Sequence, residues 1–313
     1  MFRITAYSPE LEDSWNQFVK ASRNGLFLFD RKYMDYHSDR FRDSSLLFFF
    51  DVMDLTAVMP ATIEGDVMTS HAGLTFGGII TDSRLRATDM VDLFHDLGKH
   101  LKEMGIKKLV YKAIPHIYHS IPAEEDLYAL FLTDAKLVRR DVSSTIFMPE
   151  RTPFAKERRW CVRKAQSRGT EVEESSDFGN YMEIEKKCLE SRHGVRPTHT
   201  KEEMILLAQR FPENIRLFAG VIDGRMEGGV IMYESRNVAH TQYIASTEAG
   251  RKSHVVDCVL DYLINEYYID KRYFDFGIST ENAGQYLNSS LSDYKSTFGA
   301  RATVYDTYEV NWE

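Results

Sequence analysis

The spacing of apolar residues predicts one long amphipathic helix in each half of the chain. The first has Thr88 as its expected N-cap and Gly105 as its expected end, and the second begins behind Ser253. Apolar side chains recur in both at intervals of three and four residues, at Met90, Val91, Leu93, Phe94, Leu97, Leu101 and Met104, and at Val256, Val259, Leu260, Leu263, Ile264 and Tyr267. The two N-caps are 165 residues apart, which indicates an internal repeat.

The segments around the two helices repeat in the same order. Before each helix, two short apolar runs flank a turn, Glu64-Gly65-Asp66 in the first half and Ser235-Arg236-Asn237 in the second. After each helix, a short apolar run is preceded by two basic residues, starting at Lys107 and at Lys271. A further helix and a strand follow in both halves, with the helices expected near Glu124 to Thr133 and near Asn282 to Tyr294.

Each half therefore has the order hairpin, helix, strand, helix and strand, with further helical segments in front, which is a mixed α/β pattern. This order resembles that of the GNAT acyltransferase fold. We expect two GNAT-like domains in tandem, residues 1–150 and 151–313, each a twisted mixed sheet flanked by helices. The alternative is a single doubly wound sheet, which requires regular alternation of strand and helix in place of the two meanders.

Composition places the chain among folded proteins. Its 313 residues suffice for two domains, and 43% hydrophobic with 27% charged residues is ordinary for a globular protein. The formal net charge of −8 argues against DNA or any partner bound through bulk positive charge. The three cysteines, Cys161, Cys188 and Cys258, are isolated, which favours a reducing compartment over a zinc or disulfide site. The densest apolar run, Leu46 to Phe50, is too short to cross a bilayer, so we expect a cytoplasmic protein without membrane insertion.

A turn before the second amphipathic helix is a candidate phosphate site, because the N-terminus of a helix attracts anions. GNAT enzymes hold the pyrophosphate of acetyl-CoA there with a Q/R-x-x-G-x-G/A turn. The matching residues expected to bind the cofactor are Ser246, Gly250, Arg251, Ser253 and His254. With Arg251 as the leading residue, His254 and Val256 stand where the glycines belong, so a plain capped helix remains the alternative. The first half has Arg84 to Asp89 at this place, without a glycine, and we expect no CoA there.

A basic segment follows the expected domain boundary. From Phe154 to Arg168 the chain has one acid, Glu157, and six basic residues, Lys156, Arg158, Arg159, Arg163, Lys164 and Arg168. Arg159 and Arg163 lie one helical turn apart, so we expect them, with Lys164, to bind a diphosphate of the substrate. A solvated helix face is the alternative.

A polar loop precedes the next helix. Thr200 and Glu203 form a capping box, so the helix begins there and Ser191 to His199 is the loop in front of it. His193, Arg196 and His199 are candidates for contact with an acceptor substrate, and the alternative is that they only organise the loop. No carboxylate or cysteine completes a metal-ligand set at a familiar spacing, so we expect no metal.

Two segments of the second half carry a resemblance to a known family. From Phe274 to Ala300, a strand ending in D-F-G-x-S precedes L-N-x-x-L and then Y-K-x-x-F-G-A, and Arg158 to Gly169 has the pattern R-R-x-x-x-R-K-A-x-x-x-G. Together they resemble Fem-like and related tandem GNAT-fold acyltransferases. The resemblance implies transfer of an acyl group, from a thioester or an aminoacyl-tRNA, to an amine. It also implies that Lys295, the lysine of K-x-x-F-G, lies near the transferred acyl group or its phosphates.

The resemblance leaves two donors open. Fem-like members use aminoacyl-tRNA to extend peptidoglycan precursors and commonly grip the tRNA with a helical hairpin, and no insertion of that size is present here. Other tandem members acylate amino sugars carried on nucleotides, using acyl-CoA. We therefore expect an N-acyltransferase that uses acyl-CoA, chiefly acetyl-CoA, in cell-surface polysaccharide synthesis, with no tightly bound cofactor. An aminoacyl-tRNA-dependent transferase and a non-catalytic binding protein are the alternatives.

The chemistry of acyl transfer suggests which residues carry it. His240 lies in the strand that should line the cleft and can act as general base, and the alternative is a hydrogen-bonded core histidine. Glu281 is a second candidate base, and Tyr286 or Tyr294, expected on the following helix, can return a proton. Lys295 would stabilise the oxyanion or the leaving group, and the alternative is a surface lysine at a helix end, where the helix dipole favours a cation. Tyr243 is expected at the cleft end of the strand, in contact with substrate.

Overall fold

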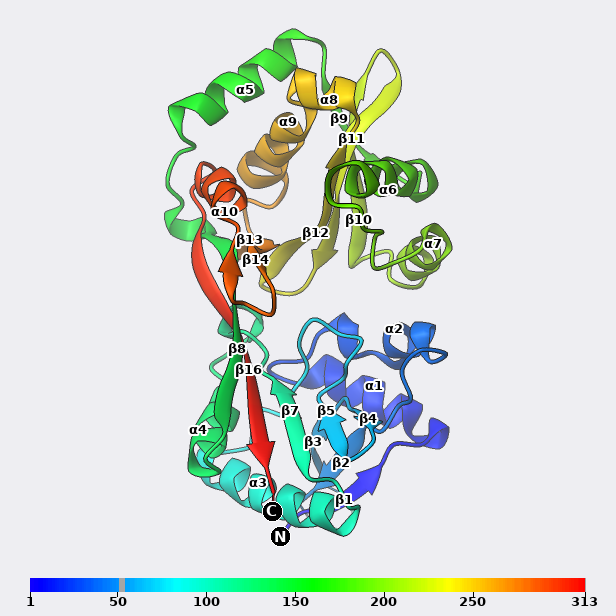
Figure 1. The fold of residues 1–313 in the computed structure, drawn as a ribbon, viewed down its shortest axis with the longest axis vertical. Coiled ribbons are helices and arrows are strands. Elements are labelled where there is room, and N and C mark those ends of the chain that lie inside the picture. The colour runs from blue at the N-terminus through cyan, green and yellow to red at the C-terminus, as the bar shows by residue number, and fades with distance from the viewer. Residues whose placement is uncertain (51–53, 313) are drawn as a thin grey trace. The chain divides into compact units, whose positions relative to one another are not determined.

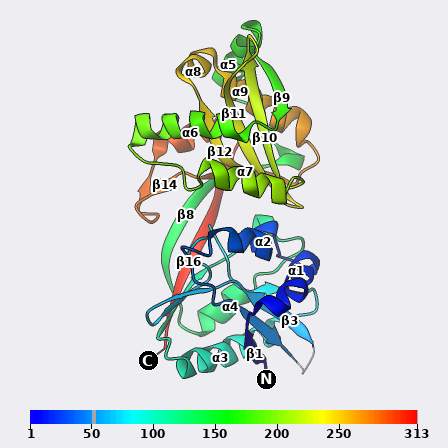
Figure 2. The same ribbon diagram turned by 90° about the vertical axis from the view of Figure 1, so that its right-hand side faces the viewer.

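The computed structural model describes residues 1–50 and 54–312, apart from the side chains of residues 192 and 193. The chain forms two compact units (Figure 1, Figure 2). The first consists of residues 1–141, 281–286 and 304–313, and the second of residues 142–280 and 287–303. None of the helices in the described residues has the length and apolarity needed to cross a membrane.

The units differ from the expected domains, 1–150 and 151–313, because two strands are shared between them. β8 (Lys136–Phe147) begins in the first unit and ends in the second, whereas β16 (Arg301–Asn311) begins in the second and ends in the first. The end of β16 pairs antiparallel with β7 (Lys108–Lys112), and the end of β8 pairs antiparallel with β13 (Tyr273–Ile278). Each half of the sequence therefore contributes the C-terminal end of its last strand to the unit formed mainly by the other half.

The first unit has two groups of paired strands, in the orders β1-β2-β3-β6 and β4-β5-β7-β16. Its other strands are β1 (Arg3–Ala6), β2 (Leu46–Phe49), β3 (Leu55–Met59), β4 (Thr62–Glu64), β5 (Val67–Thr69) and β6 (Ile80–Thr81), and its α-helices are α1 (Glu12–Ala21), α2 (Arg31–Met34), α3 (Ala87–Glu103) and α4 (Glu125–Leu132). The apolar stripe of α3 packs into the core with Phe48, Leu109 and Tyr111. The predicted stripe is thus the buried face of the helix, except for Met104, which follows the last helical residue and is exposed.

The second unit has one run of paired strands, β8-β13-β12-β11-β10-β9, in which only the β12–β13 pair is parallel. Its other strands are β9 (Glu171–Ser175), β10 (Ile215–Ile222), β11 (Arg225–Glu234) and β12 (Val238–Ser246). Its α-helices are α5 (Lys156–Ser167), α6 (Phe178–His193), α7 (Lys201–Arg210), α8 (Glu248–Ser253), α9 (Val255–Tyr262) and α10 (Ser289–Ser296). Helices α6 and α7 cover one face, and α5, α9 and α10 lie on the other (Figure 1, Figure 2).

The mixed α/β class and both predicted hairpin turns are confirmed, while several helix limits differ from the prediction. Arg86, not Thr88, is the N-cap of α3. The second predicted helix is divided, because His254 has a left-handed backbone (φ 59°) between α8 and α9, so Ser253 is not an N-cap. α6 continues to His193, which shortens the loop expected from Ser191. Residues 280–287 form a small hairpin, β14 (Thr280–Glu281) and β15 (Tyr286–Leu287), so α10 begins only at Ser289.

Candidate functional site

The centre of the candidate site is a hydrogen-bonded pair of side chains on adjacent parallel strands. His240 of β12 lies opposite Asp275 of β13 in the register, and its Nδ1 is 2.7 Å from Asp275 Oδ2. Because an ionised carboxylate only accepts hydrogen bonds, Nδ1 donates its proton, which leaves the lone pair on Nε2. The imidazole is 19% exposed, whereas Asp275 is fully buried. The pair is therefore a partly exposed base oriented by a buried acid.

Two hydroxyl groups hold the buried acid in place. Ser143 Oγ and Thr145 Oγ1, both from β8, donate to Asp275 Oδ1 at 2.6 and 2.7 Å. With His240, the carboxylate accepts three hydrogen bonds, the arrangement that a buried charge requires. None of the three residues that complete this network, Asp275, Ser143 and Thr145, was predicted from the sequence. One signal was present, because a single acid between two phenylalanines, F-D-F, interrupts an otherwise apolar strand.

The pair lies where the two parallel strands separate. The β12–β13 pairing extends only from Val238 to His240, although β12 continues to Ser246. Beyond the pair, Gly277 has a φ of +74°, and a Cβ atom there would lie 3.2 Å from His240 Cε1. Glycine is therefore required both by the backbone and by the imidazole beside it. The strand ends beyond His240 have no ladder between them, which is the separation expected of a GNAT-like sheet.

Lys295 is buried, so it is not the surface lysine of the alternative interpretation. It lies on α10 with 4% of its surface exposed, and its Nζ donates to the carbonyl oxygens of Gly277 and Ile278, each at 2.8 Å. Burial lowers the pKa of Lys295 to about 8, although the nearby Asp275 carboxylate opposes this shift. Lys295 thus fixes the end of the strand that carries Asp275. Whether it also touches an acyl group stays a prediction.

A second polar group lies on the α6 side of β12. Tyr243 OH is 2.7 Å from Nδ1 of His199 and also accepts from the backbone N–H of His199. Burial raises the pKa of Tyr243 to about 12. Tyr243 thus anchors the loop before α7. Glu185 of α6 is only 5% exposed, and its Oε2 has no hydrogen-bond partner among the described residues.

Glu185 predicts a pH dependence of stability. Burial raises its pKa to about 7, whereas that of an unfolded glutamate is about 4.3. Between these values the folded state binds more protons, so the free energy of unfolding falls as the pH rises, by up to about 4 kcal/mol in total. Glu185→Gln should remove this fall when denaturant unfolding is compared at pH 5 and pH 8. The control is Glu183→Gln, an exposed residue of the same helix. An unchanged pH dependence in Glu185→Gln would contradict the assignment.

The predicted CoA turn is folded against its neighbours. Ser246 ends β12, and Thr247 Oγ1 caps α8 by accepting from the N–H of Gly250 at 3.0 Å. A Cβ at Gly250 would lie 2.0 Å from the carbonyl oxygen of Glu227, so this glycine allows α8 to pack on β11. Arg251 is exposed. The glycine therefore has a packing reason that does not require a phosphate.

The junction of α8 and α9 also contacts α5. Arg168 Nη1 donates to the carbonyl oxygen of Lys252 at 2.6 Å and lies 3.4 Å from Ser253 Oγ. His254 Nδ1 is 3.4 Å from Asp257 Oδ2, and the indole of Trp160 meets the His254 ring edge-on. Asp257 places a carboxylate in the first turn of α9, where a phosphate would otherwise be favoured.

Arg158 connects α5 to α9 and α10. It is 7% exposed, forms a short ion pair with Asp257, and lies over the rings of Tyr294 and Phe298 at 4.6 and 5.1 Å. Cys161, His254 and Asp257 are the only three residues of metal-ligand type that cluster in the described part of the chain, with ligand atoms within 4.8 Å of one another. Because Asp257 already accepts from Arg158 and from Tyr294 OH, its carboxylate is engaged without a metal.

The other candidates on α5, Arg159, Arg163 and Lys164, have different surroundings. Arg159 lines a pocket, Arg163 is exposed, and Lys164 Nζ lies over the Trp160 ring at 4.6 Å. Arg159 and Arg163 are both exposed one helical turn apart on α5, and their joint binding of a diphosphate stays a prediction. Arg196 is exposed beside Glu190, and the side chain of His193 lies outside the described residues.

The remaining candidates for proton transfer lie in two different elements, the β14–β15 hairpin and α10. Glu281 and Tyr286 lie in the β14–β15 hairpin, where both are exposed and belong to the first unit. The prediction that Tyr286 lies on the following helix is wrong, because the chain reverses in this hairpin before α10 begins. Tyr294 does lie on α10, but its hydroxyl donates to Asp257, with burial raising its pKa well above the usual range.

Comparison with known proteins gives a family match for part of the chain and structures of similar fold for nearly all of it. Residues 151–296 match the family described as an acetyltransferase (GNAT) domain. No curated protein is significantly similar to the chain in sequence. The crystal structure of FemX is similar over 99% of this chain and 97% of its own, with a TM-score of 0.70 at 12% identity.

Two further structures share the fold. L-PGS from Bacillus licheniformis is similar over 97% of this chain and 92% of its own, with a TM-score of 0.60 at 11% identity. A tandem GNAT protein from the clavulanic acid biosynthesis pathway is similar over 99% and 98%, with a TM-score of 0.51 at 8% identity. The predicted tandem GNAT fold and the resemblance to Fem-like proteins are thus confirmed.

Proposed function

We propose that this protein, an acyltransferase of the GNAT superfamily, transfers an acyl group from acyl-CoA to a primary amine with His240 as general base. The observation that supports this role is the His240–Asp275 pair at the point where β12 and β13 separate. An imidazole oriented by a buried carboxylate is a general base that functions near neutral pH.

The proposed reaction needs three events. Nε2 of His240 takes a proton from the amine, the amine nitrogen bonds to the thioester carbonyl carbon, and the carbon–sulfur bond breaks so that the thiolate leaves and is protonated. Asp275 stays ionised and stabilises the imidazolium that forms. Lys295 holds β13 through Gly277 and Ile278, so we assign it a positioning role for Asp275 in place of a direct contact with the oxyanion.

The two faces of the sheet suggest where each substrate lies. Ala239 and Phe274 pack into the core beneath α9, so His240 and Asp275, the next residues along their strands, point to the α6 side. We propose that the amine approaches from this side, past Tyr243, and that an amino sugar carried on a nucleotide is the acceptor. The donor then comes from the side of α9 and α10.

The first unit is proposed to carry no donor site. Tyr111 stands 164 residues before Asp275, at the matching position of the repeat. Its hydroxyl donates to the buried Asp126 at 2.6 Å and accepts from the N–H of Ile79. A closed hydrogen-bond network therefore occupies the place where the second unit has its catalytic pair.

One observation favours aminoacyl-tRNA as the donor instead. The exposed side of α5 combines basic residues, Lys156, Arg159 and Arg163, with the half-exposed indole of Trp160, a pairing typical of nucleic-acid surfaces. An aminoacyl ester would then take the place of the thioester, and the same base would serve the attacking amine.

An assay with both donors tests the proposal. Labelled acetyl-CoA and labelled aminoacyl-tRNA are each incubated with the protein and a panel of amines that includes amino-sugar nucleotides. We expect labelled amide from one of the donors, and loss of this product in His240→Ala. If neither donor gives an amide although a donor raises the melting temperature, the protein is a binding protein and the proposed catalysis is wrong.

A further inference from the structure

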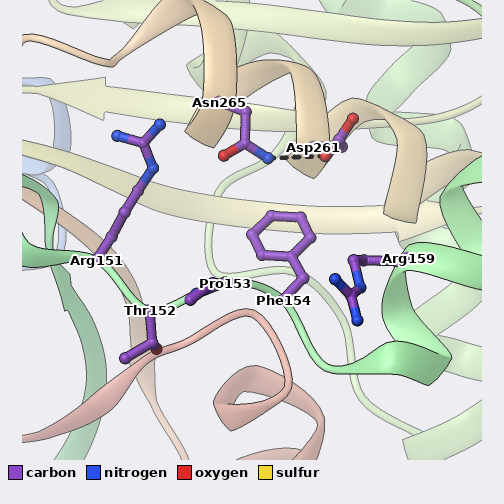
Figure 3. A pocket seen from close by; sticks show the side chains of 7 residues that line it. All are labelled: Arg151, Thr152, Pro153, Phe154, Arg159, Asp261 and Asn265. Atoms are coloured by element: carbon purple, nitrogen blue, oxygen red, sulfur yellow. Dashed lines mark hydrogen bonds between the residues drawn. The ribbon is translucent and has the colours of Figure 1, made fainter.

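A pocket of about 340 Å³ lies between the start of α5 and the end of α9 in the second unit (Figure 3). It is lined by Arg151, Thr152, Pro153, Phe154, Arg159, Asp261 and Asn265. Figure 3 shows Arg151 and Arg159 on opposite sides of the Phe154 ring, with Asn265 and Asp261 above it. The pocket thus combines two cationic side chains with an amide and a carboxyl group around an aromatic floor.

Neither arginine of the pocket has an acidic partner in the described part of the chain. Within the described residues, no ion pair or side-chain hydrogen bond joins either guanidinium to the protein, whereas Arg158 is paired with Asp257 and Arg216 with Glu174 and Glu234. A guanidinium presents a rigid fork of donors that matches phosphate oxygens.

The opposite wall of the pocket offers groups for hydroxyls. Asn265 Nδ2 donates to Asp261 Oδ1 at 2.8 Å, which leaves the other N–H and the carbonyl oxygen of this amide for a ligand. Asn265 lies in a π-helical turn (Leu263–Tyr267) that follows α9, a deviation often found at functional sites. The carboxyl group of Asp261 can accept a hydrogen bond from a hydroxyl, whereas it would repel a second anion.

We propose that this pocket binds a nucleoside phosphate, with Arg151 and Arg159 on its phosphate groups and Asp261 and Asn265 on its ribose hydroxyls. A volume of about 340 Å³ suits a small organic ligand and exceeds what a phosphate ion needs. Phe154 belongs to the core beneath α9, on the face of the sheet opposite to His240. The pocket is therefore separate from the general base, and binding can be measured without acyl transfer.

Calorimetric titration of the whole protein with AMP, ADP, adenosine and inorganic phosphate tests the proposal. We expect AMP and ADP to bind at least tenfold more tightly than adenosine or phosphate alone, because both halves of the pocket are then used. Arg151→Ala and Arg159→Ala should each weaken ADP binding at least tenfold. Arg163→Ala, the same charge change on the same helix but outside the pocket, should change it less than threefold.

Two outcomes overturn the proposal. One is the absence of nucleotide binding by the wild-type protein at millimolar concentration, and the other is an equal loss in Arg159→Ala and Arg163→Ala, which indicates diffuse surface charge. Arg151→Lys and Arg159→Lys control for a folding defect, because they keep the positive charge and remove only the bidentate hydrogen bonding of the guanidinium. Asp261→Asn should leave phosphate binding unchanged and reduce the preference for AMP over phosphate.

Discussion

Replacing His240 by alanine should lower kcat for acyl transfer by about 100- to 10,000-fold, the usual contribution of a general base. The imidazole is the one partly exposed member of a network in which Asp275, Ser143 and Thr145 are buried. Its removal therefore takes away the group that receives the proton and leaves the amine to lose it to water. The measurement is steady-state turnover with saturating donor and acceptor.

Two variants control this result. His240→Gln retains a side chain of similar length that can still bond to Asp275, and it should be as inactive as His240→Ala because an amide is not a base. His95→Ala removes an exposed histidine of α3 and should leave turnover unchanged. If His240→Gln keeps more than a tenth of wild-type turnover while remaining folded, His240 is not the base.

Arg158→Ala should lower the free energy of unfolding by about 3 to 5 kcal/mol, because it leaves the buried Asp257 without its partner. Arg158 and Asp257 have side chains 9% and 8% exposed, and the guanidinium also lies on Tyr294 and Phe298. The variant thus loses an ion pair and the packing that joins α5 to α9 and α10. Denaturant unfolding measured at constant pH and salt gives the change.

Arg159→Ala is the matched control for Arg158, since it removes an exposed arginine one position further along the same helix and should change stability by less than about 0.5 kcal/mol. Replacing both members of the pair, Arg158→Met with Asp257→Leu, should recover most of the loss, because no unpaired charge is then buried. Equal stability of the Arg158 and Arg159 single variants would show that the ion pair is not what holds α5.

Local patterns explain what could be predicted from the sequence. The hairpins, α3 and the capped start of α7 follow from turn residues, periodicity and a capping box that lie within a few residues of one another. The division of α8 from α9 could not be foreseen, because the apolar period continues through His254 while its backbone turns left-handed. The break depends on packing against α5 and β11, which are distant in sequence from His254.

The site was less predictable because its partners are distant in sequence. His240 could be proposed from its strand, but Asp275 lies 35 residues further on and Ser143 is 132 residues from Asp275. They meet only through the parallel pairing of β12 with β13 and the antiparallel pairing of β13 with β8. Lys295 was found by its motif, yet its burial follows from the position of α10 over Gly277, which no local pattern specifies.

The exchange of final strands has a consequence for biosynthesis. β7 acquires its neighbour β16 only through residues 307–311, and Val310 belongs to the core of the first unit. The first unit therefore keeps a strand edge and part of its apolar interior uncovered until residues 307–311 have left the ribosome. The unit whose strands are translated first is thus completed after the second unit, and a nascent chain stalled before residue 307 should remain sensitive to protease within residues 1–141.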